Sequence, residues 1–237
     1  MDQPVRFPWD DFPDVLIHAP ELFVKRHASY AQAKAGDAIA AARLVMDSLA
    51  DDVTNRLSLE FGQYSPVLLP VLAEESAGLN PIPRVMAEIL GYLLQWNVEK
   101  QVVQSNVVGH TGAGGFVRLA NQALFSGAVR SGLHYVLIDD FIGQGGTLAN
   151  VRGHILAQGG RVVGASVLTG KAHSAKLAPT SSQLDELRRK HGTIEPWWRQ
   201  RFGFGFDCLT ASEARYLIQT PTSERIIERL DEAGRGG

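Results

Sequence analysis

The stretch "YVLIDDFIGQGGTLANVRGHI", residues 135–155, decides the fold of this chain. It consists of four apolar residues, two adjacent carboxylates, a glycine-rich turn and a segment with apolar residues at helical spacing. The neighbouring carboxylates repel each other, and Gly143, Gly145 and Gly146 lose more backbone entropy on folding than other residues would. A bound ligand would offset both costs.

The stretch predicts a buried strand at 134–138 and a helix at 147–158 with Leu148, Val151 and Ile155 on its inner face. Similar patterns predict strands at 66–72, 98–104 and 161–170, and helices at 84–96 and 180–192. Strands that alternate with helices across short loops are typical of a doubly wound, mostly parallel α/β sheet. Residues 196–209 are predicted as a loop that leads into a strand.

The two ends of the N-terminal region have different compositions. Residues 1–20 carry four prolines and predict an irregular arm, whereas the alanine-rich residues 29–57 predict two helices. We therefore divide the chain into an N-terminal arm with a helical extension, residues 1–60, and a sheet domain, residues 61–237. Residues 107–117 are rich in glycine and predict a mobile loop.

Bulk composition narrows the classes of protein. The net charge of −2 disfavours a general nucleic-acid binder, and no apolar run approaches the ~20 residues that cross a bilayer. Cys208 is the single cysteine, so no disulfide forms within the chain. The first residues lack the basic and apolar regions of a signal peptide. We expect a cytoplasmic protein that binds no membrane.

The carboxylates and the turn together favour a sugar phosphate as ligand. In open α/β sheets ligands bind at the carboxyl ends of strands, where Asp139 and Asp140 lie. The backbone N–H groups of residues 144–147, at a helix N-terminus, suit a phosphate. The acidic pair suits ribose hydroxyls or a metal ion. The alternative is a sharp strand-to-helix turn with a solvated acidic pair.

The segment "VLIDDFIGQGGT", residues 136–147, resembles the phosphoribosyl-pyrophosphate signature of type I phosphoribosyltransferases. The resemblance extends over most of residues 66–209 and implies the fold of that family. It implies that Asp139 and Asp140 act as catalytic residues that hold the ribose hydroxyls and contact Mg²⁺. It also implies a 5′-phosphate site formed by Gly143, Gln144, Gly145, Gly146 and Thr147.

Two loops extend the resemblance. The segment "AEESAG", residues 73–78, lies where the family has its pyrophosphate loop, which implies substrate contacts from Glu75, Ser76 and Ala77. Its acids, Glu74 and Glu75, would face an anion, so either magnesium bridges them or they point away. The segment at 109–127 lies where the family has its hood and is similar to that of the competence-associated branch.

Further positions are similar to the purine branch of the family. Lys171 ends the strand after the signature helix, where purine enzymes contact an exocyclic oxygen of the base. The segment "FGFGFDC", residues 202–208, implies Phe202, or nearby Trp198, as a stacking residue and Asp207 as a ligand of a second magnesium ion. From the residue alone, Lys171 is more often a surface lysine, and only its place at the end of the strand makes the two readings equal. Trp198 is more often a packing residue than a stacking one.

Two departures from the family occur in the signature. Gln144 replaces the usual threonine, and Gly143 replaces the aspartate that the 6-oxopurine enzymes keep as a proposed base. We expect a magnesium-dependent enzyme that transfers ribose 5-phosphate between phosphoribosyl pyrophosphate and a nitrogenous base, with a purine among the candidates. The alternative is a non-catalytic module that senses a nucleotide or phosphoribosyl pyrophosphate and acts through a protein partner. A homodimer is left open.

Overall fold

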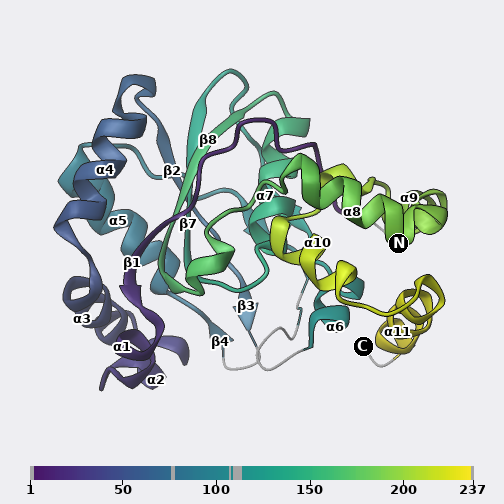
Figure 1. The fold of residues 1–237 in the computed structure, drawn as a ribbon. Helices are drawn as coiled ribbons and strands as arrows, with labels where there is room; N and C mark the ends of the chain where they lie inside the picture. The colour runs from purple at the N-terminus through teal and green to yellow at the C-terminus, as the bar shows by residue number, and fades with distance from the viewer. Residues whose placement is uncertain (1–2, 76–77, 107, 109–113, 236–237) are drawn as a thin grey trace.

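A four-stranded parallel sheet forms the centre of the computed structural model, which describes residues 3–75, 78–106, 108 and 114–235. The strands follow the order β1-β8-β7-β2 (Figure 1). Their bounds are Leu16–Pro20 for β1, Val67–Pro70 for β2, His134–Ile142 for β7 and Arg161–Gly170 for β8. The sheet confirms the predicted α/β class with parallel strands.

Both faces of the sheet are buried, which explains the unbroken apolar run at the start of β7. Tyr135 and Leu137 pack in one core cluster, whereas Val136 and Ile138 pack in another on the opposite face. Successive side chains of a strand point to opposite faces, so a strand covered on both sides needs apolar residues at every position. The four residues are fully buried.

N-terminal helices and α5 cover one face of the sheet (Figure 1). Their bounds are Glu21–Arg26 for α1, Tyr30–Lys34 for α2, Ala38–Ser48 for α3, Asp51–Phe61 for α4 and Ile82–Leu94 for α5. Leu44, Leu57 and Leu90 pack in the same cluster as Val136. The N-terminal helices therefore share one core with the sheet.

The opposite face packs against α7, Gly146–Ala157, through Val151 and Ile155. Beyond α7 lies a C-terminal helical layer with its own core around Trp198 and Phe206 (Figure 1). The layer comprises α6, Gly115–Ala120; α8, Ser181–His191; α9, Glu195–Phe202; α10, Ala211–Ile218; and α11, Ser223–Arg235. None of the described helices is long and apolar enough to cross a membrane.

Four segments differ from their predicted structure. Residues 29–57, predicted as two helices, contain α2, α3 and part of α4. Residues 16–20 of the expected arm form β1, which pairs with β8. Residues 98–104 form only a bridge from Val98 to Leu68 and the short β5, Val103–Gln104, which pairs with β6, Phe125–Ser126. Residues 196–209 contain no strand, because the aromatic side chains of Trp198 and Phe202 are one helical turn apart and pack inward from α9.

The N-terminal segment, residues 3–14, runs across α7 and is held there. The Arg152 guanidinium donates hydrogen bonds to the carbonyls of Phe7 (3.1 Å) and Pro8 (3.0 Å). The indole N–H of Trp9 donates to the Leu209 carbonyl at 2.7 Å. A Cβ atom on Gly153 would lie 1.7 Å from the Val5 carbonyl oxygen, so this path requires glycine in α7.

We predict that Gly153→Ala destabilises the protein by ~1–3 kcal/mol, the usual cost of overpacking, although alanine is the better helix former. Urea unfolding measures the effect. Gly192→Ala is the control, because a Cβ there meets Arg188 Cβ at an ordinary 3.7 Å. A midpoint for Gly153→Ala at or above that of the wild type would show that the segment does not occupy this path.

Candidate functional site

A cavity of about 340 Å³ opens at the carboxyl end of β7. Its floor is the end of β7 and the turn into α7, and its walls come from segments far apart in the sequence. The lining includes the predicted residues Asp139, Asp140, Gly143, Gln144, Gly145, Gly146 and Thr147. It also includes four cationic side chains, Arg6, Lys25, Lys34 and Arg118, that the sequence did not single out for a site.

Asp139 is buried, with 8% of its surface exposed, and its Oδ1 accepts a hydrogen bond from the Asp140 backbone N–H at 2.8 Å. Burial raises the pKa of Asp139 well above its ordinary value, and the charge of Asp140 raises it further. The environment therefore favours a neutral carboxyl at this position.

Asp140 is held in place by two side chains. Its Oδ2 accepts hydrogen bonds from Lys34 Nζ and from Asn80 Nδ2, each at 3.0 Å. Asn80 is itself fixed, because its Oδ1 accepts from the Ile82 backbone N–H in the first turn of α5 at 3.2 Å. Lys34 is the last residue of α2. Neither partner lies in a motif, so no local signal in the sequence identifies them.

The turn between β7 and α7 has the geometry of an anion site. Gly145 has a φ of +81° and precedes the first helical residue, Gly146. The first N–H groups of a helix have no partner within it, and here they lie at the cavity. A Cβ atom on Gly145 would lie 2.3 Å from Leu177 Cδ2. The backbone conformation and the packing both require glycine, independently of any ligand.

Side chains from both ends of the chain clamp this turn. Thr210 Oγ1 donates to the Gln144 carbonyl at 2.6 Å, and Arg6 Nη2 donates to the Gly146 carbonyl at 3.4 Å. Arg6 also forms a buried ion pair with Glu213 at 2.7 Å, with both side chains at most 3% exposed. Glu213 and Thr210 form the capping box at the start of α10. The turn is therefore fixed by residues 3–14 and by α10.

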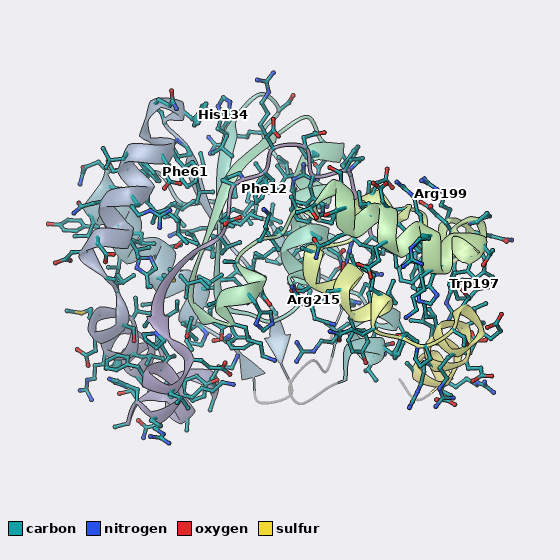
Figure 2. The ribbon with its side chains drawn as sticks, in the orientation of Figure 1. Phe12, Phe61, His134, Trp197, Arg199 and Arg215 are labelled. Atoms are coloured by element: carbon teal, nitrogen blue, oxygen red, sulfur yellow. The ribbon has the colours of Figure 1, made fainter. Side chains whose placement is uncertain are left out.

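Two predicted site residues lie away from the cavity. Phe202 is 6% exposed and packs between Trp198 and Phe204 in the C-terminal core, so the expected stacking on a base is wrong. Asp207 pairs with Arg199 at 3.4 Å and does not line the cavity. Arg199 lies at the outer end of the C-terminal layer, away from the sheet (Figure 2). Because residues 195–202 form the helix α9, the segment that contains Phe202 and Asp207 lies away from the cavity.

The predicted pyrophosphate loop is described in part. Glu75 belongs to β3, Glu74–Glu75, which pairs with β4, Gly78–Leu79, at the lower edge of the view in Figure 1. Ser76 and Ala77 lie outside the described residues. The same holds for part of the expected hood, of which α6 and the β5–β6 pair are described.

Lys171 lines a second cavity of about 370 Å³. This cavity adjoins the first, since Arg118, Gly143 and Gln144 line both. A Cβ atom on Gly143 would lie 2.6 Å from Arg118 Nη1. The Arg118 guanidinium therefore packs against the turn at Gly143.

The carboxylates do not assemble a metal centre. In the described part of the chain, no three His, Cys, Asp or Glu side chains lie together so as to hold a metal ion. Asp140 is already engaged by the Lys34 ammonium group, and Asp139 favours its neutral form. These residues do not fit a Mg²⁺ ion held by protein ligands alone.

Comparison with known proteins finds two relatives that are longer than this chain, and solved structures of low sequence identity. No family model matches the chain. It is 39% identical over 229 residues to "Protein TraN" from Escherichia coli, which covers 96% of this chain and 51% of TraN. It is 36% identical over 157 residues to an uncharacterized protein of Haemophilus influenzae, covering 66% of the chain and 35% of that protein. The chain thus spans about half and about a third of these relatives.

One similar solved structure is that of adenine phosphoribosyltransferase from Thermoanaerobacter pseudethanolicus. The identity is 16%, and the match covers 54% of this chain and 73% of the enzyme, with a TM-score of 0.33. The α/β fold is established by the strand order and by the helices on both faces of the sheet.

We predict that Asp139→Asn raises thermal stability at neutral pH. An acid whose pKa is raised on folding favours the folded state below its ordinary pKa of 3.8, and this contribution is lost as the pH rises through the raised value. Asparagine keeps the acceptor for the Asp140 N–H and has no charge to bury. We expect a melting temperature higher by ~2–4 °C at neutral pH and a difference that shrinks towards about pH 4. A variant that melts lower at every pH would contradict the buried, neutral carboxyl.

We predict that Glu213→Gln costs ~3–5 kcal/mol of folding free energy, because it leaves the Arg6 guanidinium buried without a countercharge. Urea unfolding measures it. The matched control is Glu228→Gln. Glu228 is 60% exposed and pairs with Arg225, which is 43% exposed, so this pair should contribute ~0–1 kcal/mol. Equal costs for the two variants would show that the Arg6–Glu213 pair is not buried in solution.

Proposed function

We propose that the cavity binds a ribose 5-phosphate group and that the chain is a phosphoribosyltransferase acting on phosphoribosyl pyrophosphate. One observation carries the proposal: the oriented carboxylate of Asp140 and the N-terminal turn of α7 line the same cavity at the carboxyl end of β7. A helix N-terminus suits a phosphate, and an oriented carboxylate suits a pair of hydroxyls. Ribose 5-phosphate presents both groups on one small molecule.

Each part of the site has a role in this proposal. The turn at 143–147 binds the 5′-phosphate, and Asp140 accepts hydrogen bonds from the ribose hydroxyls. Lys34 and Asn80 hold Asp140 at the angle that this requires. Fixing the sugar in this way lowers the entropy that must be lost when a nitrogen atom of the acceptor approaches the anomeric carbon.

The reaction replaces one bond at the anomeric carbon by another. The acceptor nitrogen forms a bond to this carbon while the bond to the pyrophosphate oxygen breaks, and pyrophosphate leaves with the electron pair. Where the acceptor nitrogen carries a proton, that proton is released to water. The cations of the lining would stabilise the negative charge of the leaving group. Any Mg²⁺ would be carried by the phosphate oxygens of the substrate, which are its usual ligands in such sites.

A second candidate function is a sensing module that binds the sugar phosphate without turnover. The observation in its favour is the ion pair of Asp140 with Lys34, since a substrate must share or displace this contact. Under this alternative the N-terminal helices, whose exposed apolar residues include Ile39 and Met46, would contact a protein partner.

Calorimetry with ribose 5-phosphate tests the binding site. We predict that Asp140→Asn weakens binding by ~10- to 150-fold, the loss of one charge-assisted hydrogen bond. The control is Asp185→Asn, an exposed carboxylate on α8, which should leave the affinity unchanged. Equal affinities of the wild type and Asp140→Asn would remove the role assigned to this carboxylate.

Release of pyrophosphate separates the two functions. The wild type is incubated with phosphoribosyl pyrophosphate, Mg²⁺ and a panel of nitrogenous bases. Release that depends on the base supports the enzyme. Tight binding of the sugar pyrophosphate without release on any base of the panel supports the sensing module.

A further inference from the structure

The second cavity has a lining that differs in charge from the first. Lys171 at the end of β8, Arg215 on α10 and Arg118 on α6 supply three fixed positive charges. None of the described lining residues is an aspartate or a glutamate. The first cavity, in contrast, contains Asp139, Asp140 and Glu213 beside its cations.

Arg215 is held at the wall of this cavity by a hydroxyl group and not by a carboxylate. Its Nη2 donates to Ser212 Oγ at 2.7 Å, and Ser212 Oγ lies 3.1 Å from Ser174 Oγ. Ser174 and Ser212 are buried, with 1% and 8% exposed. Figure 2 shows Arg215 between α10 and the end of the central sheet. A guanidinium group offers five donors, so most of its capacity is available to a ligand.

Lys171 and Arg215 are two cations that line one cavity and repel each other, and a bound anion relieves that repulsion. Among the described residues no carboxylate lies within ion-pair distance of Lys171 or Arg215. Carboxylates and phosphates are the groups that the planar fork of arginine binds best, in pairs of parallel hydrogen bonds. A neutral ring would leave these charges uncompensated.

We infer that the second cavity binds an anionic group, a carboxylate or a phosphate, on the molecule that is bound beside the sugar phosphate. The inference rests on the proposed function, because the first cavity then holds the ribose 5-phosphate group. Arg118, Gly143 and Gln144 line both cavities, so the two ligands lie next to each other. The molecule that accepts the ribose 5-phosphate group is therefore an anionic nitrogen heterocycle and not a neutral purine.

The test uses protein saturated with ribose 5-phosphate, which fills the turn at 143–147, and the variants below separate binding in the second cavity from binding at the other cations of the first. Matched acids and carboxamides of pyridine and pyrimidine are titrated by calorimetry, and inorganic phosphate is titrated in a separate arm. The variants are Lys171→Met and Arg215→Met. The control is Lys176→Met, an exposed lysine close in sequence that does not line the cavity.

We expect an acid or phosphate to bind at least ~10-fold more tightly than any carboxamide. Each of the two variants should weaken that binding by ~10-fold or more, and Lys176→Met should not. A preference for the acids identifies a carboxylate as the anionic group, and a preference for inorganic phosphate identifies a phosphate. Equal binding of acids and amides, unchanged affinity in both variants, or no anion binding would overturn the inference.

Failure of the proposed function gives a different result. Lys171→Met and Arg215→Met should bind ribose 5-phosphate within ~2-fold of the wild type, since neither residue lines the first cavity. If the wild type does not bind ribose 5-phosphate, the proposed function fails. The acid, amide and phosphate titrations are then carried out on the ligand-free protein. They test anion binding in the second cavity by the same criteria.

Discussion

The buried ion pair between Arg6 and Glu213 is the interaction on which the site depends. It joins the N-terminal segment to α10 across the turn that begins α7, and Arg6 reaches the Gly146 carbonyl from the same position. A buried pair of this kind adds little net stability over an apolar contact, but loss of one partner is costly. Its consequence here is positional, because it fixes the turn whose N–H groups face the cavity.

The same turn requires glycine for reasons that have no connection with a ligand. Gly145 has a positive φ and packs against Leu177, and Gly143 packs against Arg118. A substitution such as Gly145→Val would therefore disturb folding as well as binding. The acidic pair offers the cleaner probe, since Asp139 and Asp140 differ in burial and in partners. Asp139 favours its neutral form, and Asp140 is ionically paired with Lys34.

Local sequence patterns predicted the centre of the fold. The apolar run of β7, the glycine turn and the periodic residues of α7 are contiguous, so one window contains the whole strand–turn–helix unit. The sequence did not reveal β1, because five residues that end in proline carry little periodic signal. It also misassigned α9, because the aromatic residues of this short helix run directly into the glycine-rich residues 203–205, and the whole segment resembles a loop and strand. Contacts such as Lys34 with Asp140 join positions 106 residues apart, and only the three-dimensional fold brings them together.

A crystal structure of the protein with ribose 5-phosphate tests the central claim most directly. We expect the phosphate group against the backbone N–H groups at 144–147 and the ribose hydroxyls within hydrogen-bond distance of Asp140, with Arg6 still paired to Glu213. Sugar phosphate bound elsewhere, or bound here with its phosphate on the cationic side chains and away from the turn, would contradict it.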